Sequence, residues 1–216
     1  MLVGDVMTHN PVKISADTSV PAALSLMHEK KIRSLPIVDS HDRLVGLVTE
    51  KDLLYVSPSP ATTLNIWEIK ELLGKVRVEG IMVQKVITVT EDTPIEEAAR
   101  LMADDKIGSL PVLRDKTLVG IVTKTDLFNT FLAMLGGLRK GVRITALTSG
   151  AKGTVAKITN AIYGLGGDIV GLAFNEVTGH PEAGWQITVK VQDVPMDALV
   201  AALKPLVIQI KDAREI

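Results

Sequence analysis

Two short runs of the chain place hydroxyl and carboxylate side chains at the same spacing. Residues 46–52 read Gly-Leu-Val-Thr-Glu-Lys-Asp, and residues 120–126 read Gly-Ile-Val-Thr-Lys-Thr-Asp. In each run an apolar stretch typical of a strand leads into a Thr, and an Asp follows three positions later, in the first turn of an expected helix. A carboxylate there can accept hydrogen bonds from both hydroxyls of a ribose, while Thr hydroxyls and the N–H groups of a helix start suit phosphate oxygens. Both runs are therefore candidate nucleotide-binding corners.

A second interpretation of the same residues needs no ligand. Thr followed by an acidic residue at the third position is also close to a capping box, which stabilises a helix start by about 1 kcal/mol. In that case Thr49, Asp52, Thr123 and Asp126 are structural. The spacing leaves both interpretations open.

Both corners belong to an internal repeat. Met7 and Met82 lie 75 positions apart, and the same offset relates the Ser-Leu-Pro run at 34–36 to the one at 109–111. After one deletion in a polar turn the offset becomes 74, and it then relates the two corners. Matching over this length is too extensive for coincidence, so the chain holds two copies of one structural unit.

Each copy is expected to fold in the order strand, helix, strand, strand, helix. Apolar residues recur at helical spacing from Val20, with a capping run at 17–19 before them, and polar turns separate strand-like runs. In the first copy the expected strands are 11–14, 34–38 and 43–48, with helices from 20 and over 50–56. In the second copy they are 86–89, 109–113 and 116–122, with helices over 94–103 and from the second corner to Leu135. A short helix over 64–73, with Trp67 as an anchor, is expected between the copies.

The remainder of the chain has a different pattern, and glycines with a basic pair at 137–141 mark the boundary. Apolar periodicity predicts the order strand, helix, strand, strand, helix, strand, which is the split βαβ pattern of ferredoxin-like domains. The expected ranges are 142–147, 155–165, 168–177, 185–191, a helix from 195, and a last strand over 206–210. The chain is therefore expected to have an α+β fold.

Composition argues against several classes of function. Lys plus Arg number 24 against 25 Asp plus Glu, giving a net charge of −1, and aromatic residues are 3%, so no nucleic-acid partner is expected. The chain has no Cys, and its four His are scattered without ligand spacing, so neither disulfides nor a metal site is expected. No apolar run is long enough for a membrane helix, and the start of the chain lacks the pattern of a signal peptide. We therefore expect a cytoplasmic protein with no membrane partner.

The repeat resembles the CBS domain. The resemblance is carried by residues 32–39 with 46–52 in the first copy and by residues 107–112 with 120–126 in the second. In that family two repeats form a pseudo-twofold pair, often called a Bateman module.

This resemblance implies three domains. Residues 1–76 would be the first CBS repeat with its linker helix, 77–138 the second repeat, and 142–216 a domain that resembles the ACT family in element order and in its glycine loop. The combination is similar to the bacterial acetoin-utilisation protein B family. The implied fold is a tandem CBS repeat pair followed by a ferredoxin-like βαββαβ, ACT-like domain.

The resemblance to CBS domains also implies roles for single residues. It assigns ribose binding to Asp52 and Asp126, and phosphate binding to Thr49, Thr123 and Thr125. Adenine contacts would come from Val12 and Ile32 in one copy and from Ile87 and Ile107 in the other.

The copies differ at the phosphate end. The first has Lys51 where the second has Thr125, and it has Arg33 where the second has Gly108. CBS families often use the position of Arg33 for a basic phosphate contact, so we expect unequal affinities. All of these residues are predicted to contribute to nucleotide binding.

Domains of the ACT family commonly bind amino acids at interfaces made by paired sheets. The corresponding effector loop here would include Gly150, Lys152 and Gly153, although it lacks the Asp and Pro often found before the first glycine. This domain is expected to serve either as a second-effector site or as a dimerisation module.

The sequence thus predicts a non-catalytic regulatory protein whose CBS pair senses an adenine nucleotide: AMP, ADP or ATP. We expect a homodimer that acts on a regulated protein of unknown identity. The alternative is a structural homodimerisation or assembly module without ligand sensing. No nucleophile paired with a base, no metal-ligand spacing and no Walker loop occurs in the sequence, so neither an enzyme nor a catalytic cofactor is expected.

Overall fold

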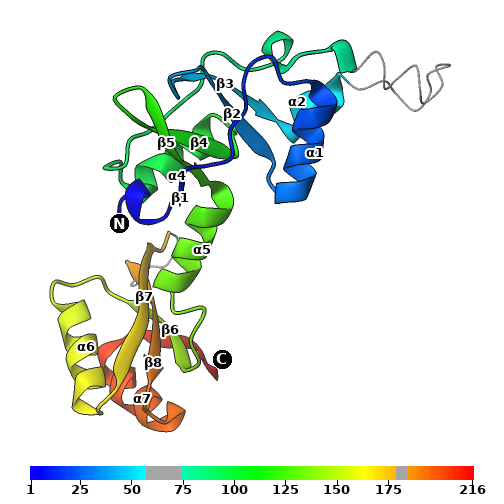
Figure 1. The fold of residues 1–216 in the computed structure, drawn as a ribbon. Coiled ribbons are helices and arrows are strands. Elements are labelled where there is room, and N and C mark those ends of the chain that lie inside the picture. The colour runs from blue at the N-terminus through cyan, green and yellow to red at the C-terminus, as the bar shows by residue number, and fades with distance from the viewer. Residues whose placement is uncertain (57–73, 179–183) are drawn as a thin grey trace. The chain divides into compact units, whose positions relative to one another are not determined.

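The computed structural model describes residues 1–56, 74–178 and 184–216, which fall into two compact units, Met1–Leu127 and Phe128–Ile216 (Figure 1). The predicted helix over 64–73 and Trp67 lie outside the described residues. In the part that is described, the first unit has two buried cores, one in each copy, and the second unit has one.

The first copy folds around a helix and a hairpin. Helix α1 (Val20–Lys30) begins at Ser19, whose Oγ accepts a hydrogen bond from Ala22 N at 3.4 Å. Its buried side chains are Val20, Ala23 and Met27, at the spacing of one helix face. The hairpin of β2 (Ser34–Val38) and β3 (Leu44–Thr49) packs on this face, and α2 (Glu50–Tyr55) closes the copy.

The second copy repeats this arrangement. Helix α4 (Ile95–Asp104) buries Ile95, Ala98 and Met102. It packs on the hairpin of β4 (Ser109–Arg114) and β5 (Thr117–Thr123), and α5 (Lys124–Met134) follows.

The strands predicted at 11–14 and 86–89 were wrong. At each place the structure has a single bridge, Ile14 with Ile37 and Val89 with Val112. Ile14 N donates to Pro36 O and Val89 N donates to Pro111 O. Pro36 and Pro111 have no N–H to donate back to the 11–14 and 86–89 segments. The strand pairing of each segment therefore cannot extend beyond its single bridge.

The copies exchange the segments that precede their first helices. Val3, in η1 (Val3–Asp5), and Met7 pack in the core of the second copy, and β1 (Thr8–His9) pairs with β5. Conversely, Val78, in η2 (Val78–Gly80), packs in the core of the first copy. Each copy therefore completes the other, and both have to fold together.

The described part of the second unit is built from six further helices and strands and a short 3-10 helix. In chain order these are β6 (Val142–Thr148), α6 (Thr154–Gly164), β7 (Asp168–Glu176), β8 (Trp185–Gln192), α7 (Met196–Leu203), η3 (Lys204–Leu206) and β9 (Gln209–Glu215). The strands form a four-stranded antiparallel sheet in the order β7-β8-β6-β9. Buried residues of α6 and α7, among them Ile158 and Leu199, join the core formed by one face of this sheet.

The last strand differs from the prediction of 206–210, since β9 runs from Gln209 to Glu215. Only Ile210 and Ala213 of this strand pack against the core, and charged residues fill most of its other positions. An edge strand tolerates such charges, which hide the alternation that a sequence search looks for. The apolar residues that follow α7 begin at Pro205, which lies in η3 and not in a strand.

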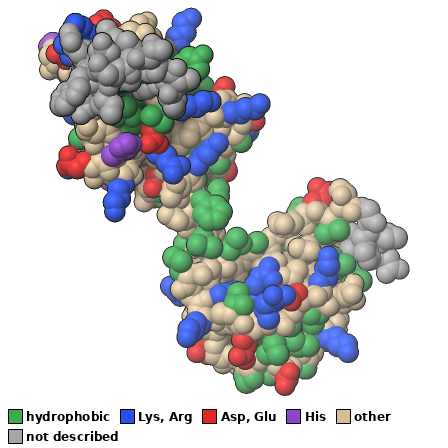
Figure 2. All heavy atoms as spheres, turned by 90° about the vertical axis from the view of Figure 1, so that its right-hand side faces the viewer, with side chains coloured by type: hydrophobic (Ala, Val, Ile, Leu, Met, Phe, Trp, Pro, Cys, Tyr) green, Lys and Arg blue, Asp and Glu red, His purple; other side chains and the backbone are tan. Residues whose placement is uncertain are grey.

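Charged side chains of both signs are mixed on the face of the molecule seen in Figure 2, in line with the net charge of −1. Among the described residues, no helix combines the length and apolar character needed to cross a bilayer.

Candidate functional site

The Thr–Asp corners form reciprocal caps in both copies. Thr49 donates to Asp52 Oδ2 from its backbone N at 2.9 Å and from its Oγ1 at 2.6 Å, and Asp52 N donates to Thr49 Oγ1 at 3.3 Å. The pair of Thr123 and Asp126 shows the same three bonds, at 2.8, 2.7 and 3.3 Å. The capping interpretation is therefore correct for both corners.

These caps leave room for a ligand. A carboxylate has two oxygens, each able to accept more than one hydrogen bond, so a capping Asp can also receive a ribose hydroxyl. Capping and nucleotide binding are compatible at the same side chain.

The backbone N–H groups of the corner are less accessible than expected. In the second copy Thr123 N donates to Asp126, Lys124 N donates to Gly108 O at 3.0 Å, and Asp126 N donates to Thr123 Oγ1. In the first copy, Glu50 N likewise donates to Arg33 O at 3.0 Å. The expectation that these amides receive an anion was therefore wrong at three of the four positions 123–126.

A cleft of about 830 Å³ lies beside the second corner and is lined by both copies. The Oγ atoms of Ser34 and Ser109, which are repeat-equivalent residues, lie 3.0 Å apart in it and join the copies. Its lining residues are Thr8, Val12, Lys31, Ile32, Arg33, Ser34, Thr49, Glu50, Lys51, Gly108, Ser109, Ile121, Thr123, Lys124, Thr125 and Asp126.

Nine of the twelve residues predicted to bind a nucleotide line this cleft: Val12, Ile32, Arg33, Thr49, Lys51, Gly108, Thr123, Thr125 and Asp126. The other three, Asp52, Ile87 and Ile107, do not line it. The cleft thus combines the Asp of the second copy with the apolar positions of the first.

Seven lining residues were not predicted: Thr8, Lys31, Ser34, Glu50, Ser109, Ile121 and Lys124. A signal was present for Ser34 and Ser109, which match across the repeat. Thr8 could not have been found in this way, because it reaches the cleft through the exchange of β1, where it pairs with Ile121.

The lining sorts into three chemical types. Val12, Ile32 and Ile121 offer apolar contacts of the kind that enclose a flat base. Asp126 and Glu50 offer carboxylate acceptors, and the Ser and Thr residues offer hydroxyls. Positive charge comes from Lys31, Arg33, Lys51 and Lys124. Among the described residues no group of three or more His, Cys, Asp or Glu could hold a metal ion.

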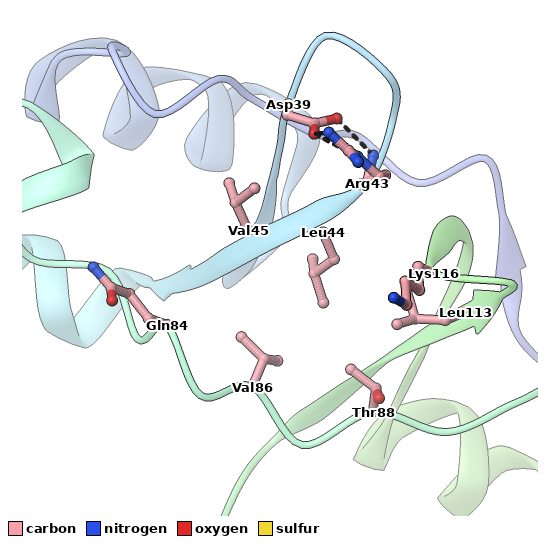
Figure 3. Close-up of a pocket in the computed structure, with 9 residues that line it drawn as sticks. All are labelled: Asp39, Arg43, Leu44, Val45, Gln84, Val86, Thr88, Leu113 and Lys116. Atoms are coloured by element: carbon pink, nitrogen blue, oxygen red, sulfur yellow. Dashed lines mark hydrogen bonds and ion pairs between the residues drawn. The ribbon is translucent and has the colours of Figure 1, made fainter.

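A second hollow, of about 450 Å³, lies at the hairpin turns of the repeats (Figure 3). Two of its charged side chains, Asp39 and Arg43, bind each other in an ion pair of 2.7 Å. Hydrogen bonds from Arg43 N first, and then from His41 N and the Arg43 side chain, hold the pKa of Asp39 below its usual value. Apolar side chains such as Val45, Val86 and Leu113 make up much of the rest.

In the second unit, the predicted effector loop is exposed at Gly150, Lys152 and Gly153. Gly150 and Gly153 have φ values of 71° and 83°, which favour glycine. A hollow of about 700 Å³ is lined by residues 140–142 and 191–195, at the opposite end of β6 from this loop. Effector binding by the loop stays a prediction.

Comparison with known proteins points to one family for the first unit. The family description "CBS domain" matches residues 3–59 and 78–133. A CBS domain-containing protein of Dictyostelium discoideum is 35% identical over 136 residues, which cover 62% of this chain and 94% of that protein. Inosine-5'-monophosphate dehydrogenase of Nitrosopumilus maritimus is 28% identical over 181 residues, but the chain spans 34% of that enzyme.

Similar solved structures lead to the same family. The CBS domain pair of protein MJ0100, in complex with 5'-methylthioadenosine and S-adenosyl-L-methionine, is 31% identical with a TM-score of 0.51, covering 64% of this chain and 98% of that one. CBSX2 in complex with AMP is 34% identical with a TM-score of 0.52, covering 61% and 96%. A Vibrio cholerae protein assigned to acetoin utilization is 30% identical with a TM-score of 0.53, covering 63% and 93%.

Proposed function

The chain belongs to the CBS domain family, and from this premise we propose that it is a non-catalytic regulatory protein whose repeat pair binds an adenine nucleotide. Two similar CBS pairs hold adenosine-containing ligands, AMP in one and S-adenosyl-L-methionine with 5'-methylthioadenosine in the other. The observation that carries the proposal is the cleft of about 830 Å³ that brings Asp126 and Thr125 together with Val12 and Ile32.

In the proposed complex the adenine lies among the apolar side chains, and Asp126 accepts hydrogen bonds from the ribose. Thr123 and Thr125 then face the phosphates. The ligand touches both copies, so its binding stabilises their arrangement. It can shift that arrangement only by the difference between its affinities for the two states.

Calorimetric titration with AMP, ADP and ATP tests the proposal. We expect saturable binding to the full chain, and we expect the Asp126→Asn variant to lose about tenfold or more in affinity, since a charge-assisted hydrogen bond is worth about 1.5–3 kcal/mol. Asp52→Asn is the matched control, because Asp52 has the same capping bonds but does not line the cleft. An absence of heat with all three nucleotides would exclude the proposed function.

We further propose that the second unit is a ferredoxin-like, ACT-like domain, as in proteins of the acetoin-utilisation type. Its order of elements, βαββαβ, and its sheet order, β7-β8-β6-β9, support this assignment. Its role would be dimerisation or the binding of a second effector.

An assembly role without ligand sensing is the second candidate, and one surface favours it. Phe128, Phe131, Leu132 and Leu135 recur at helical spacing along α5 and the residue after it, and all four are exposed, Phe128 by 68%. Such a stripe gains free energy when a second helix covers it. We propose that a second copy of the chain does so, giving a homodimer.

Light scattering on a sizing column tests the dimer. We expect a mass of two chains for the wild type and of one chain for the Phe128→Glu, Leu132→Glu double variant. Val155→Glu, an exposed apolar residue on α6, is the control and should remain dimeric. A wild-type monomer at micromolar concentration would overturn this part of the proposal.

A further inference from the structure

The repeat copies contribute different chemistry to the cleft. Resting on the proposed function, we propose that the cleft selects adenine nucleotides with two or three phosphates over AMP, and AMP over uncharged or cationic adenosine derivatives. The second copy holds the ribose through Asp126, and the first copy supplies apolar contacts to the base and most of the positive charge for the extended phosphate chain.

Backbone amides do little of the anion binding at the second corner. Three of the four N–H groups from Thr123 to Asp126 already donate within the protein, to Asp126, Gly108 and Thr123. Phosphates in the cleft therefore have to be met largely by side chains, and selectivity among nucleotides depends on which side chains are present.

The side chains that line the cleft are strongly biased toward positive charge. Lys31, Arg33, Lys51 and Lys124 face two carboxylates, Glu50 and Asp126. Glu50 lies 3.3 Å from His28 Nε2, and Asp126 is held in its cap. In the part of the chain that the structure describes, none of the four cations forms an ion pair within the protein.

The positive charge is unevenly divided between the copies. Three of the four cations come from the first copy. At two positions the repeat-equivalent residue of the second copy is neutral: Arg33 corresponds to Gly108, and Lys51 corresponds to Thr125. Asp126, which receives the ribose, belongs to the second copy. We therefore expect the phosphates of a nucleotide held there to meet the cations of the first copy, since the Ser34–Ser109 contact joins the two copies in the same cleft.

This division predicts how ligands are ranked. Each added phosphate brings negative charge to a wall with more cations than carboxylates, so affinity rises from adenosine through AMP and ADP to ATP. S-adenosyl-L-methionine carries a sulfonium cation, which the same wall repels. We expect a gain of roughly fivefold for each added phosphate at low ionic strength, shrinking as salt screens the exposed cations.

The test is calorimetric titration of the full chain with adenosine, AMP, ADP, ATP and S-adenosyl-L-methionine at two salt concentrations. The rising series described above supports the inference, and AMP binding as tightly as ATP would overturn it while leaving the proposed function intact. A lack of binding by all five ligands would instead remove the proposed function together with this inference.

A matched pair of variants locates the effect. Lys31→Gln removes a cation that lines the cleft, and Lys106→Gln removes the repeat-equivalent cation, which does not line it. Both lysines have the same backbone conformation, with φ of 54° and 55°, so the two substitutions carry the same structural risk. We expect Lys31→Gln to weaken ATP several-fold more than adenosine, and Lys106→Gln to change neither.

Variants at the two asymmetric positions complete the test. Arg33→Gln and Lys51→Gln should each compress the ratio of ATP to AMP affinity while leaving adenosine binding nearly unchanged. Equal losses for adenosine and ATP would mean that these residues support the cleft structurally, and this would overturn their assignment to the phosphate chain.

Discussion

The Thr–Asp corners of the two copies share their hydrogen bonds but not their surroundings. The three capping bonds of Thr49 with Asp52 and of Thr123 with Asp126 agree within 0.1 Å. Yet only the second Asp lines the cleft of about 830 Å³. A local sequence signature therefore specifies the cap, while the neighbouring copy decides what the cap faces.

The exchange of segments explains how these surroundings arise. Because β1 pairs with β5, Thr8 and then Val12 approach the corner of the second copy. The corner of the first copy receives the segment after η2 instead, where Val83 bridges to Leu47. Thr8 is polar where its repeat equivalent Val83 is apolar, so equal caps acquire unequal neighbours.

The largest predicted losses of stability come from truncations in the cores of the two copies. These losses should be equal, because the interiors of the copies are equivalent. Met27 and Met102 are exposed by 0% and 1%, and each packs between its helix and its hairpin. Met27→Ala and Met102→Ala should each lower the free energy of unfolding by about 2–5 kcal/mol, as truncations in a packed core do. Urea unfolding measures this.

Met134→Ala provides the control, since Met134 is 53% exposed and should tolerate truncation. A clearly smaller loss for one of the two buried positions would break the claim that the copies are equivalent inside.

A second pair of substitutions should separate stability from binding. Gly46 and Gly120 each face a methionine from the exchanged segment: a Cβ at Gly46 would lie 2.5 Å from Met82 Sδ, and one at Gly120 would meet Met7 Sδ. Gly→Ala at either position should cost about 1–3 kcal/mol through overpacking. Only Gly120→Ala should also weaken nucleotide binding, because the next residue, Ile121, lines the cleft.

Thermal unfolding and calorimetry on the same samples check both halves of this prediction. Gly80→Ala is the matched control, as no atom lies within 4 Å of the added Cβ. If Gly46→Ala weakened nucleotide binding as much as Gly120→Ala, the exchanged segments would not distinguish the copies.

Removing either cap should lower the stability by a smaller amount, which should be equal in the two copies. Thr49→Ala and Thr123→Ala each remove the acceptor for the Asp N–H, and each should cost about 1 kcal/mol of stability. Thr→Ser at either position keeps the hydroxyl and should restore most of the loss. Unequal costs, measured by urea unfolding, would show that the similarity of the caps hides different local stabilities.

Much of this fold could be predicted because its signals are local. Ser19 as a helix cap, the apolar spacing of α1 and α4, and the polar turns of both hairpins are set by residues close together in the chain. The repeat itself was visible because the same residues recur at a fixed offset. The strands at 11–14 and 86–89 failed because Pro36 and Pro111, which limit their pairing, lie in other strands.

The composition of the cleft could be predicted only in part. The residue types at the corners were evident, but not which copy's apolar residues accompany which Asp. That pairing depends on the crossing of β1 to β5, a long-range contact that leaves no periodic pattern in the sequence. Likewise, the loss of backbone N–H donors at the second corner depends on Gly108 O, from a neighbouring strand end.

The smallest predicted effect again contrasts the copies, at the ion pairs near their hairpin turns. The pKa of Glu91 is lowered chiefly by hydrogen bonds from the Arg114 side chain, at 2.8 Å, whereas the pKa of Asp39 is lowered chiefly by the backbone N–H of Arg43. A carboxyl group whose pKa is lower in the folded state than in the unfolded state stabilises the fold at pH values above its unfolded-state pKa. That contribution is lost as the pH falls through the folded value, so the Glu91 pair should weaken below about pH 4.5 and the Asp39 pair below about pH 3.8.

Substitution of each arginine should separate the two causes. Arg114→Gln should return the pKa of Glu91 toward its usual value, because the dominant donor is gone. Arg43→Gln should leave the pKa of Asp39 largely lowered, because the glutamine keeps the backbone N–H and that of His41 remains. Carboxyl titration followed by NMR measures both shifts, and an equal return at both sites would show that side-chain charge dominates in the two copies alike.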